Sequence, residues 1–161
     1  MNYKVIKNFL PKKVHKEIQT IMTAGNFPWY YCDSGGDPTD TERYYFIHIF
    51  KTHEKINSDF WNPIMVPILE RFQPKEIYRV RGNLTPKEEK NYESSAHTDE
   101  IFKHKVALYY VNTNNGYTLI EDKIKIPSIA NSCLFFDGHL SHKAVSQTDE
   151  KIRVNVNITY I

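Results

Sequence analysis

Residues 105–120 read KVALYYVNTNNGYTLI, and this stretch indicates a β-rich fold. Half of its first eight residues are β-branched or aromatic, which is a composition typical of a strand. The run that ends in Asn115-Gly116 is a turn of the type that favours positive φ, so residues 117–120 are predicted to return as the second strand of a β-hairpin. Further short strands are expected at 124–126, 132–136 and 152–160. Strands at this spacing, separated by turn residues, predict a β-sandwich or barrel.

The N-terminal half supplies helices that could cover such a sheet. Residues 11–25 predict a helix, with His15 on its solvated side and an apolar stripe formed by Val14, Ile18, Ile21 and Met22. A second helical segment is expected over 57–72, broken or kinked by two prolines. Strands are expected at 27–32, 44–50 and 77–84. In the second of these, His48 is expected inside an aromatic layer, with a substrate contact as the alternative.

Length and charge narrow the classes of protein. A chain of 161 residues predicts a single domain, 1–161. The formal charge of +2, with no concentrated basic tract, argues against a nucleic-acid binder. No signal-peptide pattern and no apolar run of about 18 residues is present, so a soluble cytoplasmic protein without a membrane partner is expected. Cys32 and Cys133 lack the short spacing of a zinc site and are expected to be reduced packing residues.

The chemistry is expected around His97-Thr98-Asp99. If this triplet lies on a strand, His97 and Asp99 point to one face, because side chains alternate along a strand. Such a triplet is weak evidence alone, but His139 and His142 follow downstream as candidates for a third ligand. Two histidines and one carboxylate form the facial triad that binds ferrous iron and leaves positions open for other ligands.

Polar strand faces leave two readings open. The final strand places Arg153, Asn155, Asn157 and Thr159 on one face, and the strand at 77–84 does the same with Arg79, Arg81 and Asn83. Either face could be solvated, or it could line a polar cavity and touch an anionic ligand. The turn-forming run 33–40 could likewise be a lid over a substrate or an ordinary surface loop.

A resemblance becomes specific at this point. The segments 97–99, 109–112 and 135–137, together with His142 and Arg153, resemble the Fe(II)- and 2-oxoglutarate-dependent oxygenases. They are most similar to the small prolyl-4-hydroxylase-like members encoded by tailed phages. The segments 26–31 and 112–118 are also similar to that group, so the resemblance spans nearly the whole chain.

The resemblance implies a double-stranded β-helix, a jelly-roll or cupin-like fold that is mainly β with flanking helices. It implies helical support mainly within 11–72 and a metal-binding core at 77–161. The catalytic metal ligands would be His97, Asp99 and His142, because the family's distal histidine precedes the basic co-substrate residue by about ten positions. That basic residue would be Arg153, and Tyr110 would share the far carboxylate of 2-oxoglutarate.

The implied reaction is hydroxylation of a C–H bond by a dioxygenase that uses Fe(II), dioxygen and 2-oxoglutarate, with ascorbate as a candidate reductant. The substrate that is hydroxylated, here called the prime substrate, would be a prolyl or other residue of a protein or peptide, or a small molecule. A phage-encoded chain would act in the cytoplasm of the host cell. Asn155 and Asn157 depart from the last-strand pattern of prolyl hydroxylases, which puts the prime substrate in doubt.

Four alternatives remain open from the sequence. His97 and His142 could be ordinary polar residues of a sandwich. A cupin-like module could bind metal or ligand without catalysis, and a zinc hydrolase could use the same three side chains. A nucleic-acid demethylase of the same superfamily is the main alternative in substrate class, with Arg79, Arg81 and residues 87–90 as a weak basic patch.

Overall fold

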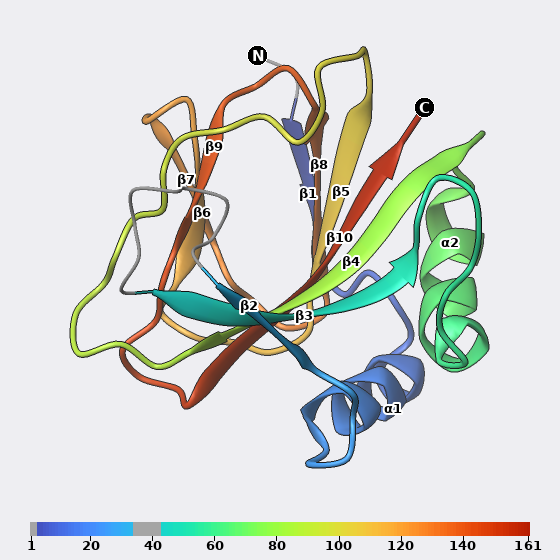
Figure 1. Ribbon diagram of the computed structural model, residues 1–161, viewed down its shortest axis with the longest axis horizontal. Helices are drawn as coiled ribbons and strands as arrows, with labels where there is room; N and C mark the ends of the chain where they lie inside the picture. The colour runs from blue at the N-terminus through green and yellow to red at the C-terminus, as the bar shows by residue number, and fades with distance from the viewer. Residues whose placement is uncertain (1–2, 34–42) are drawn as a thin grey trace.

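The computed structural model describes residues 3–33 and 43–161, and these form two antiparallel sheets with helices on one outer face (Figure 1). The major sheet has the strand order β1-β8-β5-β10-β4-β3-β2 and the minor sheet the order β7-β6-β9. In the major sheet the strands are β1 (Tyr3–Ile6), β2 (Tyr30–Asp33), β3 (Tyr44–Lys51), β4 (Ile77–Pro86), β5 (Lys105–Tyr110), β8 (Ser132–Asp137) and β10 (Ile152–Tyr160). In the minor sheet they are β6 (Tyr117–Ile120), β7 (Ile124–Pro127) and β9 (His142–Val145).

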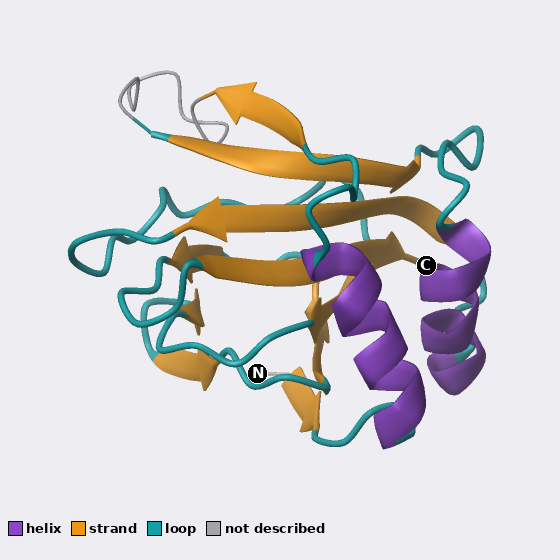
Figure 2. Cartoon of the chain, turned by 90° about the horizontal axis from the view of Figure 1, so that it is seen from below, coloured by secondary structure: helices purple, strands orange, loops and turns teal. Residues whose placement is uncertain are grey.

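The helices cover the face of the major sheet that points away from the minor sheet (Figure 2). They are α1 (Lys12–Thr23), a π-helical turn η1 (Trp61–Met65) and α2 (Val66–Phe72). The proline-containing segment changes from a π-helical turn to an α-helix at Val66, and the backbone angles of Met65 and Val66 both stay helical. None of the helices within residues 3–33 and 43–161 has the length and apolar character needed to cross a membrane.

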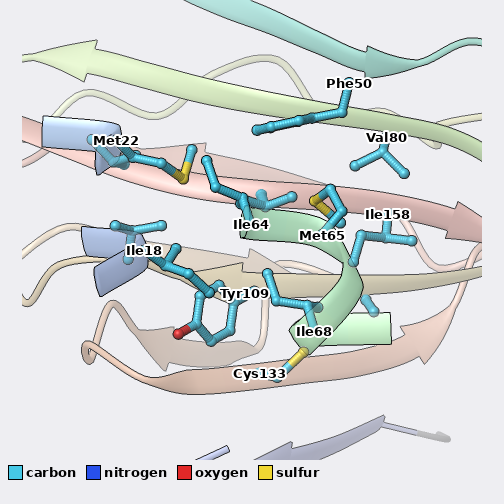
Figure 3. Close-up of a cluster of buried hydrophobic side chains, with 14 of the residues drawn as sticks. Ile18, Met22, Phe50, Ile64, Met65, Ile68, Val80, Tyr109, Cys133 and Ile158 are labelled. Carbon is cyan, nitrogen blue, oxygen red and sulfur yellow. The ribbon is translucent and has the colours of Figure 1, made fainter. Parts of the chain in front are cut away.

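Two hydrophobic layers hold the fold together. The outer layer fills the space between the helices and the major sheet (Figure 3). Its fully buried members include Ile18, Met22, Phe50, Ile64, Met65, Ile68, Val80, Tyr109 and Ile158. The inner layer lies between the sheets and contains Val106, Leu108, Tyr110, Ile120, Ile126, Leu134, Phe136 and Leu140. Alternate residues of β5 enter the two layers, which is the period of two expected for a strand covered on both faces.

The hairpin predicted over residues 105–120 is wrong. β5 pairs with β8 and β10 in the major sheet, whereas β6 pairs with β7 and β9 in the minor sheet. The connecting turn is held by side chains: Asn112 Oδ1 accepts from Val154 N at 2.8 Å and Asn114 Oδ1 accepts from Gly116 N at 3.0 Å. These bonds direct the chain from one sheet to the other. Positive φ occurs instead at Glu121 and Asp122, in the turn between β6 and β7.

Two expectations about histidines have opposite outcomes. His15 is not solvated: it is buried, and its Nδ1 lies 2.6 Å from the Tyr109 hydroxyl on β5. The expectation for His48 is confirmed, because its ring packs against Phe27 and Phe50 while both ring nitrogens are hydrogen-bonded. The segment proposed as a lid, 33–40, lies outside the described residues from position 34 onward.

Candidate functional site

His97, in a loop, and His142, on a strand, are brought together by hydrogen bonds between their backbones. The triplet 97–99 belongs to the connection between β4 and β5 and not to a named strand, so the strand assumed for it is wrong. His97 alone forms an isolated bridge to His142, the first residue of β9, with N–H···O distances of 3.1 and 2.9 Å. This bridge places the two imidazole rings 4.5 Å apart between centroids.

Asp99 completes a cluster that could hold one metal ion. The ligand atoms of His97, Asp99 and His142 all lie within 4.8 Å of one another, and His142 Nε2 is 3.8 Å from Asp99 Oδ2. His142 and the Asp99 carboxylate are buried, whereas His97 is exposed. His139, the other candidate, is exposed in the turn before β9 and is not part of the cluster.

Backbone carbonyls orient both imidazoles. His97 Nδ1 lies 3.1 Å from the Ser95 carbonyl oxygen, and His142 Nδ1 lies 3.2 Å from that of Leu140. A proton on each Nδ1 leaves the Nε2 lone pair available for a metal, which is the usual arrangement of ligating histidines. Burial lowers the pKa of His142, although the Asp99 carboxylate opposes that shift. The His142 ring is therefore favoured in the neutral form that binds metals.

Two strand residues hold the Asp99 carboxylate. Arg79 Nη2 donates to Asp99 Oδ1 at 3.3 Å, and Asn157 Nδ2 donates to Asp99 Oδ2 at 3.2 Å. Arg79 also forms an ion pair with Glu100 at 3.4 Å. The reading of the 77–84 strand as a solvated sheet edge is wrong, because β4 lies between β10 and β3. The alternation of the strand predicts that Arg79 lies on the polar face with Arg81 and Asn83. It does not predict that Arg79 binds the Asp99 carboxylate.

Arg153 is a buried cation held only by neutral groups. Its side chain lies on β10, the residue is 2% exposed, and Nε donates to Ser128 Oγ at 2.9 Å. Nη2 donates to the Tyr117 carbonyl and to Thr118 Oγ1, both at 3.4 Å. No carboxylate pairs with it among the described residues, and burial lowers its pKa. A buried guanidinium without a counter-charge is costly, so this site is suited to an anion.

Tyr110 lies beside this network without lining the cavity. It is fully buried on the inner face of β5, and its hydroxyl donates to Thr118 Oγ1 at 2.8 Å. Burial raises the pKa of Tyr110 to about 12, so the phenol stays protonated. Thr118, which does line the cavity, stands between Tyr110 and Arg153. Thr118 and Ser128 were not predicted from the sequence, because nothing local distinguishes them from other Ser and Thr hydroxyls.

A single cavity connects the metal-ligand cluster with Arg153. Its volume is about 180 Å³, and His97, His142 and Arg153 all line it. Its polar wall carries Arg81, Asn83, Asn155 and Asn157, and its apolar wall carries Val106, Leu108 and Phe136. The cavity is thus lined by two of the three potential metal ligands, His97 and His142, by the guanidinium-bearing Arg153 and by an apolar wall between the sheets.

No protein-family model and no curated protein matches the sequence. Solved structures do match the fold. A 2-oxoglutarate–Fe(II) oxygenase-family oxidoreductase from Burkholderia pseudomallei has a TM-score of 0.69 at 10% identity, over 98% of this chain and 84% of the other. A prolyl hydroxylase from Trichoplax adhaerens, in complex with a hypoxia-inducible-factor peptide, has a TM-score of 0.67 at 15% identity, over 99% and 83%. The α-ketoglutarate-dependent epimerase SnoN of nogalamycin biosynthesis has a TM-score of 0.67 at 13% identity, over 99% and 77%.

These structures agree with the expectation of a jelly-roll with flanking helices. Each of the three aligns with nearly the whole described chain, at identities that establish the fold alone. The chain therefore has the double-stranded β-helix fold of the 2-oxoglutarate-dependent iron oxygenases.

Proposed function

We propose that this protein is an Fe(II)- and 2-oxoglutarate-dependent dioxygenase that hydroxylates a C–H bond of a prolyl or other residue in a protein or peptide. His97, Asp99 and His142 would hold the iron, and Arg153 would bind the far carboxylate of 2-oxoglutarate. The fold supports this reaction class, since it is shared with a 2-oxoglutarate–Fe(II) oxygenase-family oxidoreductase, a prolyl hydroxylase and an α-ketoglutarate-dependent epimerase. The prolyl-hydroxylase-like subtype, phage origin and host-cytoplasmic location stay predictions from the sequence resemblance.

One observation carries the proposal: a buried arginine, which has no carboxylate partner among the described residues, shares a cavity with the two histidines of a His-Asp-His cluster. The donor set fits the iron, because two imidazoles and one carboxylate form the ferrous facial triad. The arginine fits the co-substrate, because a dicarboxylate chelated at the cluster would present its second carboxylate across the cavity. A zinc hydrolase would explain the cluster but would leave Arg153 without a partner.

When bound, the iron and 2-oxoglutarate supply oxidative decarboxylation coupled to hydroxylation, which yields succinate, carbon dioxide and an alcohol from dioxygen and the prime substrate. The chain's own residues orient these groups. Arg79 and Asn157 hold the Asp99 carboxylate, and the carbonyls of Ser95 and Leu140 hold the two imidazoles. Fixed ligands require less reorganisation when the substrates bind.

The apolar side chains of the cavity wall would exclude water from the site. Val106, Leu108 and Phe136 present apolar side chains to the space between the cluster and Arg153. An apolar wall strengthens the ion pair between the Arg153 guanidinium and a carboxylate, because fewer water molecules screen it. It also limits side reactions of the oxidising centre with solvent.

Anaerobic titration with Fe(II) and 2-oxoglutarate tests the assignment. The wild-type protein should develop the visible charge-transfer band of a chelated 2-oxo acid. Arg153→Ala should weaken 2-oxoglutarate binding by at least about 30-fold, since truncating one member of a buried charge pair costs about 2–5 kcal/mol. Arg71→Ala is the matched control, because Arg71 lies on α2 and donates to the Phe9 carbonyl on the helix side of the major sheet. Equal loss in both variants, or no band in the wild type, would refute the proposal.

The same preparation separates the alternatives. Activity restored by zinc without 2-oxoglutarate would indicate a hydrolase, and metal binding without succinate release from any substrate would indicate a cupin-like binding module. Succinate release stimulated by methylated oligonucleotides but not by peptides would indicate a nucleic-acid demethylase. Addition of ascorbate to each assay tests whether a reductant sustains turnover.

A further inference from the structure

We infer that the prime substrate presents a carboxylate to Arg81, a second arginine on the cavity wall. The inference rests on the proposed function and names the chemical class of its substrate. Arg81 lines the same cavity as the His-Asp-His cluster and Arg153. It therefore provides a second place where an anion could be held.

The strand register places Arg81 beside the metal-ligand cluster. On β4, Arg81 is the direct cross-strand partner of Asn157, the residue that donates to the Asp99 carboxylate. Arg153 pairs with Thr85, four residues further along the same two strands. At about 3.3 Å per residue this separates the two arginine rows by about 13 Å along the sheet. The backbones of the two arginines therefore lie at opposite ends of the polar wall.

Within the part of the chain that the structure describes, Arg81 lacks the carboxylate partners that two other cations of the cavity wall, Arg43 and Lys143, have. Arg43 is 3.4 Å from Glu88, and Lys143 Nζ is 2.7 Å from an Asp122 carboxylate oxygen. Arg81 has no carboxylate or hydrogen-bond partner in the described ranges, and its Nε is buried and unsatisfied. The aromatic ring of Tyr45 lies 6.0 Å from the guanidinium carbon of Arg81. A ring at that distance is a weak substitute for an anion.

The charges of the loaded site sharpen the argument. The two positive charges of Fe(II) and that of Arg153 balance the Asp99 carboxylate and the two carboxylates of 2-oxoglutarate. Arg79 is balanced by Glu100, its ion-pair partner at 3.4 Å. The guanidinium of Arg81 is then the positive charge that remains unmatched beside the cluster. A single carboxylate on the prime substrate would neutralise it with the bidentate geometry that arginine favours.

Asn83 narrows the substrate class further. It lies two residues from Arg81 on the same face of β4, and its Nδ2 donates to Asn155 Oδ1 at 3.0 Å. Its own Oδ1 is buried and accepts no hydrogen bond in the structure. This acceptor suits an N–H group of the substrate. Arginine donors beside an amide acceptor match a carboxylate close to an N–H, which occurs in a free amino acid and in an acidic residue of a peptide.

Matched acids and amides test the inference. The Fe(II)–2-oxoglutarate complex, held anaerobically, is titrated with free amino acids and their α-amides, and with acetylated peptides containing Asp or Glu and their Asn or Gln counterparts. Displacement of the visible band measures binding, and succinate release in air measures coupling. We expect one of the acid series to bind about 10- to 100-fold more tightly than its amide, the range of a charged hydrogen bond. The series that responds distinguishes a free amino acid from an acidic peptide residue.

Variants assign the effect to Arg81. Arg81→Gln should abolish the preference for acid over amide, Arg81→Lys should retain part of it, and Arg71→Gln should retain all of it. The 2-oxoglutarate affinity should stay within about twofold of wild type in each, which is a free-energy change below about 0.5 kcal/mol. The Lys variant and the wild-type comparison remain informative if Arg81→Gln does not fold.

Several outcomes would overturn the inference while leaving the proposed function intact. One is equal binding of acids and amides by the wild type. Another is that none of the acids binds at concentrations up to about 10 mM, which already corresponds to very weak binding, or that only oligonucleotides bind. A third is loss of 2-oxoglutarate binding in Arg81→Gln as large as that in Arg153→Ala. Failure of the wild type to form the complex with Fe(II) and 2-oxoglutarate would instead refute the proposed function.

Discussion

Replacing Gly116 with alanine should displace the Arg153 side chain although none of the polar residues of the site is itself substituted. A Cβ at this position would lie 2.8 Å from the Val145 carbonyl oxygen, 2.8 Å from Asn114 Oδ1 and 3.0 Å from Arg153 Cδ. Carbon atoms in favourable contact lie about 3.5–4.0 Å apart, so these approaches are repulsive. The Val145 oxygen belongs to the backbone of β9 and cannot withdraw without moving the minor sheet. The side chains of Arg153 and Asn114 are the neighbours that can yield.

The expected magnitude follows from two opposing effects. Overpacking a filled site costs about 1–3 kcal/mol. Alanine recovers about 0.4–1 kcal/mol by restricting the unfolded chain. The net loss of about 1–2 kcal/mol corresponds to a decrease in Tm of about 2–8 °C for a protein of this size. Displacement of the Arg153 side chain should also weaken 2-oxoglutarate binding.

Thermal unfolding with and without 2-oxoglutarate, in the presence of Fe(II) and without oxygen, measures both effects. Gly25→Ala is the matched control, because a Cβ there has no atom within 4 Å. That variant should be as stable as wild type or slightly more stable. At a concentration of 100 Kd, 2-oxoglutarate should stabilise the wild type and Gly25→Ala by about 2.7 kcal/mol and Gly116→Ala by less. The reasoning is refuted if Gly116→Ala matches Gly25→Ala in both Tm and response to 2-oxoglutarate.

Three further predictions concern acid stability, a buried amide and the metal ligands. Burial lowers the pKa of His48, so below pH 6.5 the unfolded chain binds a proton that the native state resists. As the pH is lowered, the free energy of unfolding, measured with denaturant, should therefore decrease by up to about 1.4 kcal/mol per pH unit, and the decrease should be smaller in His48→Gln. Asn131→Ala should cost about 2–4 kcal/mol in the same assay, because the Asn131 amide satisfies both the N–H and the carbonyl of Leu10, at 2.9 and 2.8 Å. Arg79→Gln should weaken Fe(II) binding about 10- to 100-fold in an anaerobic titration by releasing the Asp99 carboxylate, and unchanged affinity would exclude the positioning role.

Local patterns in the sequence predict strands and faces well where a strand is regular. β10 places Arg153, Asn155 and Asn157 on one face, as its uninterrupted alternation indicates. Alternation could not show which face is wet, because the same pattern fits an exposed surface. The structure resolves this through the sheet order, since β10 lies between β5 and β4 and both of its faces are covered.

Long-range pairing explains the failures. The turn at Asn115-Gly116 has the composition of a hairpin, yet β6 leaves the sheet of β5 and pairs with β9. Gly116 is required by the close approach of the Val145 backbone and not by positive φ. His15 is similar: its helix position is polar by sequence, and only the packing of α1 on β5 brings the Tyr109 hydroxyl to it. His15 and Tyr109 are 94 residues apart in the sequence, so their contact leaves no local signal.

The polar wall of the cavity is best understood by asking which of its groups the protein itself satisfies. Asn155 accepts from Asn83, and Asn157 donates to Asp99, whereas the Oδ1 atoms of Asn83 and Asn157 are buried without a hydrogen-bond partner among the described residues. Arg153 and Arg81 have no carboxylate partner in the described part of the chain. Buried ionic groups commonly stabilise a fold no better than apolar residues of similar volume, so stability alone does not account for two unmatched guanidiniums in one cavity. A diacid at one end and a carboxylate beside the metal ligands would account for both.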